Sequence, residues 1–338
     1  MTDRTIDWVE GEIHLIDQTR LPDELVILRI TALDDLVDAI VRLAVRGAPA
    51  LGVAGAMGVA LLAANHPRDE AAVRNGAARL RAARPTAINL AWGTDRALAR
   101  LSEGPAAVLT EALAIRDEDI AACGAMAVRG ADLVRELVAR PRIRIMTICN
   151  TGALAAVERG TALGVIGEVH ARGQLEEALP LETRPLLQGA RLTAWELARM
   201  GAPFRLLVDG AAASVLARRL ADIVIIGADR ITANGDTANK VGSLGLALAA
   251  KHAGVPFMVV APESTIDAAT PGGAGIEIEE RGADEVTTFR GVRSAPAGTR
   301  TLNPAFDVTP ASLITAIVTD LRVIRTDHGE RPAQRPAG

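Results

Sequence analysis

From Pro141 onward the sequence repeats one pattern, in which a short, uninterrupted apolar run is followed by turn residues and then by a helical stretch. The apolar runs are 142–148, 204–208, 222–228 and 256–262, and helical stretches at 150–160, 210–220 and 241–254 lie between them. Apolar strands that alternate with helices are typical of a parallel sheet covered on both faces. We therefore predict a Rossmann-like α/β domain with a mostly parallel sheet.

The N-terminal part of the chain follows a different pattern. Residues 5–30 form short β segments that break at Leu21-Pro22-Asp23, and residues 32 to about 140 carry apolar positions at helical spacing. A chain of 338 residues is longer than one hydrophobic core usually supports. The predicted organisation is a small, mainly helical N-terminal domain with a short β segment (1–130), the α/β domain (131–326) and a polar, proline-rich, disordered tail (327–338).

One uncharged stretch, residues 48–64, is close to the length of a membrane span. It is rich in alanine and glycine and lacks the cationic and aromatic flanks of membrane segments. Gly52, Gly55 and Gly58 recur every three residues, so the helix can pack closely on a neighbour. We interpret this stretch as a buried core helix.

The bulk composition excludes several functional classes. With a net charge of −4, the protein has no overall electrostatic attraction to nucleic acid or anionic lipid. Aromatic residues make up only 2% of the chain, so few side chains are available on which bases could stack. Two cysteines do not form a disulfide framework, and the N-terminus has no apolar signal region. These features predict a cytoplasmic protein with no nucleic-acid or membrane partner.

Two residues with chemical potential follow predicted strands. Cys149 comes directly after the strand over 142–148 and, with a helix expected from about Ala153, would lie at a helix N-terminus that favours a thiolate. Asp229 follows the strand over 222–228, where partial desolvation would raise its pKa. Ligands of open parallel sheets bind at the carboxyl ends of the strands. Alternatively, Cys149 is a small buried hydrophobe and Asp229 a turn residue.

Other residue patterns argue against common cofactors. Cys123 lies mid-helix on an apolar face and is assigned to the core. The sequence contains no Walker A motif, dinucleotide-binding glycine pattern or nucleophile elbow. Its five histidines, at positions 14, 66, 170, 252 and 328, lack the spacing of metal ligands. We predict no cofactor and no metal.

Eight blocks occur in a fixed order across the chain, which from Trp8 to about Thr319 resembles one family. They are RGAPA at 46–50, RPTAINL at 84–90, CNTGALA at 149–155, ETRPLLQGARLTAWEL at 182–197, GADRI at 227–231, NGD at 234–236, NKVG at 239–242 and NPAFDVTP at 303–310. A single NGD or RGAP would be weak evidence, but eight ordered blocks are specific. The chain resembles the methylthioribose-1-phosphate isomerases, within the initiation-factor 2B-like isomerase family.

The resemblance implies a two-domain fold, a homodimer and a cofactor-free aldose–ketose isomerisation with a sugar phosphate as substrate. It carries over Cys149 and Asp229 as the catalytic pair. It also carries over a set of substrate contacts: Arg46, Gly47, Ala48, Arg84, Gln188, Asn239 and Lys240.

The chemistry of these residues agrees with such roles. Arg46 and Arg84 are fixed cations whose donors suit a phosphate, although any single arginine is more often a solvated surface residue. Gly47 and Ala48 precede a helix, whose free N–H groups can bind an anion. Lys240 adds a point charge. Gln188, in an apolar helix, needs a polar partner that sugar hydroxyls or an internal hydrogen bond could supply.

The chain departs from the family in two places. Residues 209–212 read DGAA where the family usually has DNMA or DSMA, and residues 242–244 read GSL where it commonly has GTY. These changes affect the expected substrate more than the reaction class.

The expected reaction, part of methionine salvage, converts 5-methylthioribose 1-phosphate to 5-methylthioribulose 1-phosphate. The apolar segment 88–92 suits the methylthio group, and the unassigned Arg144, Arg184 and Arg230 leave a second phosphate open. Two alternatives stay open. One is a sister isomerase for 5-deoxyribose 1-phosphate or ribose 1,5-bisphosphate, and the other is a non-catalytic, initiation-factor-like regulatory subunit that binds protein partners.

Overall fold

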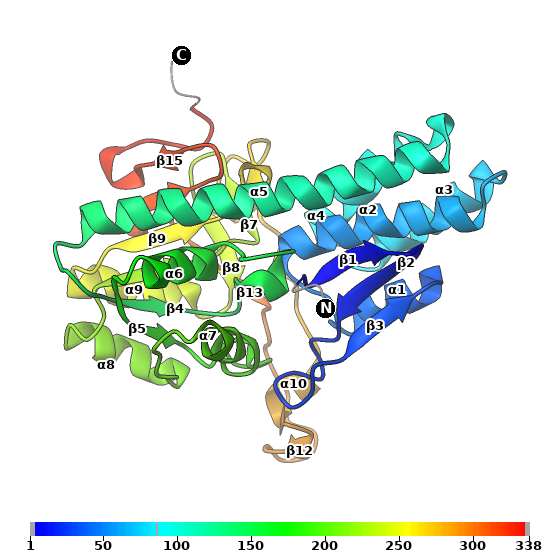
Figure 1. The fold of residues 1–338 in the computed structure, drawn as a ribbon. Helices are drawn as coiled ribbons and strands as arrows, with labels where there is room; N and C mark the ends of the chain where they lie inside the picture. Colours follow the sequence, from blue (N-terminus) through cyan, green and yellow to red (C-terminus); the bar gives the residue numbers. More distant parts are fainter. Residues whose placement is uncertain (1–3, 86, 335–338) are drawn as a thin grey trace. The chain divides into compact units, whose positions relative to one another are not determined.

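The computed structural model describes residues 4–85 and 87–334, and the chain divides into two compact units (Figure 1). Unit 1 comprises Met1–Ala127 and Asn150–Gly164, and unit 2 comprises Val128–Cys149 and Val165–Gly338. The domain boundaries expected from the sequence, at 130/131 and 326/327, stay predictions. The short segment Asn150–Gly164, which those limits assign to the α/β domain, groups with unit 1.

Unit 1 contains the β segment and the helices that the sequence predicts. Strands β1 (Ile6–Val9), β2 (Glu12–Ile16) and β3 (Ile27–Ile30) form an antiparallel sheet in that order. The helices are α1 (Leu33–Val41), α2 (Ala48–Asn65), α3 (Glu70–Ala82), α4 (Ile88–Leu98) and α5 (Pro105–Leu137), which continues into unit 2; the 3-10 turn η1 (Leu101–Glu103) joins α4 to α5. Ile6, Ile13 and Leu36 are fully buried in the shared core.

Helix α2 is the buried core helix that the sequence predicts. Its length and composition would allow it to cross a membrane, but 78% of this 18-residue window is buried inside the protein. A β-carbon on Gly55 would lie 2.6 Å from the Leu90 carbonyl oxygen, and one on Gly93 would lie 2.0 Å from the Gly52 carbonyl oxygen. Glycine on both helices therefore lets the α2 and α4 backbones meet.

Unit 2 is built on a six-stranded sheet with the order β15-β14-β9-β6-β4-β5. The strands are β4 (Ile143–Thr147), β5 (Leu175–Pro180), β6 (Ile223–Ile226), β9 (Phe257–Val260), β14 (Ala316–Val318) and β15 (Val323–Ile324). All neighbours pair in parallel except β15, which is antiparallel at the edge. Every residue of β6 and β9 is buried, so both faces of the sheet are covered, and the predicted mostly parallel sheet is confirmed.

Three helices lie between the strands of this sheet along the chain (Figure 1). Helix α6 (Ala162–Ala171) follows β4, helix α8 (Ala212–Ala217) precedes β6, and helix α9 (Ser243–Ala253) precedes β9. Alternate residues of β6, Val224 and Ile226, pack in one cluster with Leu216 of α8 and Leu246 of α9. The α5 and α6 backbones approach at Gly130, where a β-carbon would lie 2.4 Å from Val165 Cγ2.

A second sheet extends from the end of β6, where the sequence suggested only a glycine-rich loop. It has the order β10-β7-β8-β13, with β10 (Ile266–Asp267), β7 (Arg230–Thr232), β8 (Thr237–Lys240) and β13 (Phe306–Thr309). A hairpin, β11 (Thr288–Phe289) and β12 (Val292–Arg293), follows α10 (Asp284–Thr287). The remaining elements are η2 (Ala153–Ala155), the π-helical turn η3 (Gly189–Thr193), α7 (Ala194–Met200), η4 (Asp209–Ala211), η5 (Glu263–Thr265), η6 (Gly273–Gly275), η7 (Ala311–Leu313) and η8 (Thr326–His328).

The strand predicted over 204–208 is wrong. Phe204 and Leu207 make only isolated parallel bridges, to Ala178 of β5 and to Leu181. Pro180 of β5 has no N–H to donate, so a continuous ladder cannot form there. In the predicted tail, residues 327–334 include part of η8, and the Pro332 and Gln334 carbonyls accept hydrogen bonds from Arg322. Residues 335–338 lie outside the described part of the chain.

Candidate active site

The predicted catalytic residues follow neighbouring parallel strands of unit 2. Cys149 lies two residues beyond β4, and Asp229 lies three residues beyond β6. These strands pair directly, with Ile145 opposite Ile223. The thiol-bearing residue is 9% exposed, and the carboxylate-bearing residue is partly buried. Both residues therefore lie at the same carboxyl edge of the sheet, where the sequence analysis expected them.

The helix expected after Cys149 is absent at that position. Only the 3-10 turn η2 forms at Ala153–Ala155, and the next α-helix, α6, begins at Ala162. The cause is a tight return of the chain: Gly152 and Gly160 form an antiparallel bridge, and a β-carbon on Gly160 would lie 2.3 Å from the Thr151 carbonyl oxygen. The prediction that a helix N-terminus activates the Cys149 thiol is therefore wrong.

Hydroxyl groups hold the backbone at Cys149 instead. The φ angle of Cys149 is +64°, in the left-handed region. Its N–H donates to Thr183 Oγ1 over 2.8 Å, and its carbonyl oxygen accepts from Thr193 Oγ1 over 2.7 Å. Asp209 in turn accepts hydrogen bonds from the backbone N–H groups of Thr183 and Arg184, over 2.8 and 2.7 Å.

Asn239 and Lys240 lie at the end of β8, opposite the segment that begins with Asp229. The pairing of Arg230 with Ala238, continued by one residue, puts Asp229 opposite Asn239, and the Asp229 N–H donates to the Ala238 carbonyl over 2.9 Å. Lys240 Nζ donates to the Ala305 carbonyl over 2.7 Å and lies 4.5 Å from the centre of the Phe306 ring. Both Asn239 and Lys240 are buried, and their backbone lies beside the Asp229 segment in the β7–β8 hairpin.

Residues 242–244, where the sequence departs from the family, include a serine that holds the Asn239 side chain. Ser243 is fully buried, its hydroxyl accepts from Asn239 Nδ2 over 2.9 Å, and it donates to the Lys240 carbonyl over 2.8 Å. Asp307 accepts from the N–H groups of Gly242 and Leu244, over 2.7 and 3.0 Å. Burial raises the pKa of the Asp307 carboxyl in spite of these two hydrogen bonds.

Gln188 lies immediately before the π-helical turn that carries Thr193. It is 5% exposed, and its side-chain oxygen Oε1 has no hydrogen-bond partner within residues 4–85 and 87–334. A buried amide oxygen in this state is ready to accept from a ligand hydroxyl, and an internal partner for Oε1, the alternative in the sequence analysis, is not found.

Unit 1 carries the other four predicted substrate residues. Arg46 is 9% exposed; its Nε donates to Gln18 Oε1 over 3.1 Å, and one terminal nitrogen donates to the Asn150 carbonyl over 3.0 Å. The other terminal nitrogen donates to Asn150 Oδ1. Gly47, with φ +94°, directly precedes α2, which begins at Ala48, so the predicted helix N-terminus is confirmed there.

Arg84 lies in the turn between α3 and α4 and is partly buried. Thr86 of the same block lies outside the described residues. The supporting roles of Thr183, Thr193 and Ser243 were not predicted from the sequence. The first two lie in the block 182–197, but nothing in the sequence indicates that their hydroxyls contact Cys149.

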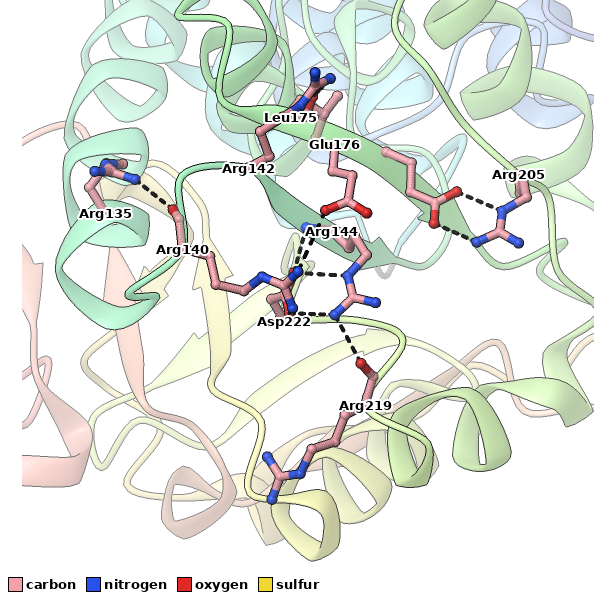
Figure 2. Close-up of polar contacts among 10 residues, drawn as sticks. Arg135, Arg140, Arg142, Arg144, Leu175, Glu176, Arg205, Arg219 and Asp222 are labelled. Carbon is pink, nitrogen blue, oxygen red and sulfur yellow. Dashed lines mark hydrogen bonds and ion pairs between the residues drawn. The ribbon is translucent and has the colours of Figure 1, made fainter.

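Cationic side chains gather elsewhere in unit 2, at the amino end of β4 (Figure 2). Asp222 accepts hydrogen bonds from Arg144 N over 2.8 Å, Nε over 3.1 Å and a terminal nitrogen over 2.8 Å, and Arg140 adds a contact at 3.3 Å. Burial acts to raise the pKa of Asp222, but the bonds from Arg144 outweigh it and lower the pKa. Arg144 also donates to the Arg219 carbonyl, so its guanidinium has a structural role.

Within the two described stretches, 4–85 and 87–334, His, Cys, Asp and Glu side chains nowhere form a group of three that could hold a metal ion. The residues predicted for substrate binding are arginine, lysine and amide side chains with backbone N–H groups. These are donors for a phosphate and for hydroxyls, and they are poor metal ligands.

A family model described as the initiation factor 2 subunit family matches residues 44–326. The chain is 50% identical to a probable bifunctional methylthioribose-1-phosphate isomerase/methylthioribulose-1-phosphate dehydratase of Nocardia farcinica, over 99% of this chain but only 61% of that protein. It is 50% identical to a methylthioribose-1-phosphate isomerase of Anaeromyxobacter sp. (strain Fw109-5), over 95% of this chain and 94% of that protein. It is 47% identical to a 5-deoxyribose 1-phosphate isomerase of Moorella thermoacetica, over 98% and 97%.

Two solved structures are similar over nearly the whole chain. The 5-methylthioribose 1-phosphate isomerase of Pyrococcus horikoshii OT3 superposes with a TM-score of 0.88 at 39% identity, over 95% of this chain and 92% of that chain. A structure described as translation initiation factor eIF-2B, subunit delta, from A. fulgidus superposes with a TM-score of 0.84 at 37% identity, over 95% and 96%.

Proposed function

The chain belongs to the initiation factor 2 subunit family. From its similarity to methylthioribose-1-phosphate isomerases we propose that it is an isomerase that converts 5-methylthioribose 1-phosphate to 5-methylthioribulose 1-phosphate. The observation that carries the proposal is the pair Cys149 and Asp229 at the ends of the neighbouring strands β4 and β6. A subunit that only binds proteins has no need for a thiol and a carboxylate at one edge of its sheet.

The substrate sets the chemical problem. A 1-phosphate has no free anomeric hydroxyl, so its ring does not open easily. We assign to Asp229 the proton transfers at the ring oxygen and at O2. Cys149 either takes the proton from C2, through an enediol-like intermediate, or stabilises the carbonyl while hydride moves from C2 to C1. In the hydride shift the hydrogen at C2 moves to C1 itself, and in the enediol route C2 loses a proton and C1 gains one. In either case no external oxidant or reductant is needed.

The remaining residues are assigned by the groups they offer. In unit 1, Arg46, Arg84 and the α2 N-terminus at Gly47 and Ala48 offer donors for the phosphate. In unit 2, Gln188 offers an unsatisfied amide oxygen for a sugar hydroxyl. Asn239 and Lys240 are assigned to the substrate as well, because they lie beside Asp229 in the β7–β8 hairpin.

The engaged arginines favour a substrate with one phosphate. Arg144 is bonded to Asp222 (Figure 2). It lies near the amino end of β4, whereas Cys149 follows the carboxyl end of that strand. Arg184 donates to the carbonyls of Glu285 and Val286, and Arg230 lies 3.9 Å from Asp267. Because these three arginines have partners elsewhere, we do not assign a second phosphate to them, and we expect ribose 1,5-bisphosphate to be a poor substrate.

The named relative from Moorella thermoacetica favours 5-deoxyribose 1-phosphate as a second substrate. An apolar site discriminates weakly against a smaller apolar group, by about 1–3 kcal/mol. We therefore expect this compound to react more slowly than the methylthio sugar. The proposed enzyme is a cytoplasmic homodimer of methionine salvage that needs no cofactor or metal.

The test is an isomerase assay on the purified protein with all three sugar phosphates. We expect Cys149→Ala and Asp229→Asn each to lower kcat at least ~100-fold, the scale of a lost acid–base group. Cys123→Ala is the matched control, because Cys123 is the other free cysteine and is fully buried on α5. Near-normal turnover in a folded Cys149→Ala or Asp229→Asn variant would remove that residue from the mechanism. A clear preference for the bisphosphate would overturn the substrate assignment.

A further inference from the structure

Cys149 has a backbone conformation that residues with a side chain rarely adopt. At φ +64° its β-carbon crowds the following carbonyl oxygen, and glycine would be the usual choice. Backbone strain of this kind persists only where surrounding groups determine the conformation. The direction of the Cys149 side chain therefore depends on the groups that hold its two flanking peptide units.

Two buried hydroxyls hold those peptide units from opposite sides. Thr183 Oγ1 accepts from the Cys149 N–H, and Thr193 Oγ1 donates to the Cys149 carbonyl, over 2.8 and 2.7 Å. The Thr183 hydroxyl hydrogen is itself committed to the Leu181 carbonyl over 2.9 Å, which leaves the oxygen free to accept. Thr183 and Thr193 are 0% and 1% exposed, so water does not compete for these bonds.

The two threonines are themselves fixed by unusual local structure. Asp209 accepts from the Thr183 N–H over 2.8 Å. Thr193 ends the π-helical turn η3, and its hydroxyl donates to the Cys149 carbonyl. The turn begins at Gly189, where a β-carbon would lie 1.7 Å from the Leu181 carbonyl oxygen, so no larger residue fits.

We propose that Thr183 and Thr193 are positioning residues that fix the Cys149 thiol by holding its backbone in the left-handed conformation. The proposal rests on the proposed function, in which Cys149 takes part in the reaction. Loss of either hydroxyl removes one of the two bonds that hold the strained backbone, so the backbone at residue 149 relaxes and the sulfur moves. A shift of about 1 Å in a reacting group costs on the order of 100-fold in rate.

The experiment compares Thr183→Val and Thr193→Val, which keep the shape of the side chain and remove the hydroxyl, with Thr183→Ser and Thr193→Ser, which keep the hydroxyl. The control is Thr147→Val. Thr147 lies on β4 and is 1% exposed, and its Oγ1 has no hydrogen-bond partner in the described part of the chain. It therefore tests the loss of a nearby buried hydroxyl that does not hold Cys149.

We expect each valine variant to lower kcat by about 10–100-fold with KM changed less than about threefold. The serine variants and the Thr147→Val control should stay within about threefold of wild-type kcat. Valine variants with wild-type kcat, or serine variants as slow as the valine variants, would overturn the proposal. If a valine variant does not fold, the alanine variant replaces it, because a water can enter the vacated space.

A second readout separates this proposal from the proposed function. In a Cys123→Ala background, alkylation by iodoacetamide reports Cys149 alone, which is 9% exposed in the native structure. The valine variants should react several-fold faster than wild type, and the serine and Thr147→Val variants at the wild-type rate. If wild type shows no isomerase activity, this comparison still decides the proposal. Equal alkylation rates in all variants would then overturn it.

Discussion

Replacing Gln188 with methionine is expected to stabilise the free protein and to impair the enzyme. The Gln188 amide oxygen is buried and lacks a hydrogen-bond partner in the described residues, and such a group costs about 1–3 kcal/mol of folding free energy. Methionine has a similar length and no polar group that needs a partner. The free energy of unfolding should therefore rise by about 1–2 kcal/mol, measured by urea unfolding without ligand.

The same substitution removes the acceptor that a sugar hydroxyl would use. Leaving that hydroxyl unpaired in the complex should raise KM, or lower kcat/KM, by about 5–100-fold. Gln174→Met is the matched control: its amide oxygen is likewise buried without a partner within residues 4–85 and 87–334, but it lies just before the amino end of β5. The control should gain stability and keep wild-type kinetics. If Gln188→Met lowers stability while Gln174→Met raises it, Gln188 has a partner in solution and the reasoning fails.

Three further predictions concern charge and cofactors. Burial raises the pKa of Asp119 to about 6, although its carboxylate accepts the Val157 N–H over 2.9 Å. The folded state therefore keeps a proton that the unfolded state loses above about pH 4, and stability falls as pH rises from about 4 to 6. Relative to wild type, Asp119→Asn should gain up to about 3 kcal/mol across this window in urea unfolding; a pH-independent difference would contradict the raised pKa. Arg46→Ala and Arg84→Ala should each cost roughly 1.5–3 kcal/mol of binding free energy, seen mainly in KM; the phosphate assignment fails if inorganic phosphate inhibits both variants as well as it inhibits wild type. Activity should survive exhaustive EDTA treatment and need no nucleotide, and recovery that requires a divalent ion would refute this.

Arg46 calls for a control of its own, because its guanidinium is bonded to Gln18 and Asn150 as well as being assigned to the phosphate. Asn150 follows Cys149 in the chain, so Arg46→Ala can act through the backbone next to the proposed catalytic residue. Arg84, in the turn between α3 and α4, provides the comparison. A kcat loss in Arg46→Ala that is absent in Arg84→Ala would indicate the backbone effect, whereas a shared KM effect would indicate phosphate recognition.

The strand ends were predictable because they depend on local patterns. The uninterrupted apolar runs over 142–148 and 222–228 specify β4 and β6, and parallel pairing then brings their ends to one edge whatever the loops do. Helix α2 was predictable for a similar reason, because its run of alanine, glycine and other apolar residues contains no charged side chain that would need contact with water. In these cases the neighbours in the sequence carry most of the information.

The loop after Cys149 could not be predicted, because its conformation depends on distant contacts. Residues 150–160 have apolar positions compatible with a helix, but the Gly152–Gly160 bridge and the Asp119 bond to the Val157 N–H fold them back instead. The hairpin of β7 and β8 was missed because β8 is completed by β13, which lies more than sixty positions further along the chain. The hydroxyls that hold Cys149 also come from residues more than thirty positions away.

Two features that lower stability lie close to Cys149, and together they fit a catalyst better than a subunit that only binds partners. A non-glycine residue with φ +64° costs on the order of 1–2 kcal/mol, and a buried amide oxygen without a partner costs a similar amount. Both occur in one neighbourhood, since Thr193, five residues after Gln188, bonds to the Cys149 carbonyl. A protein that needed only an outer surface for partners would gain stability by placing glycine at 149 and an apolar residue at 188. Their presence together at the carboxyl edge of the sheet is better explained by a substrate that uses both groups.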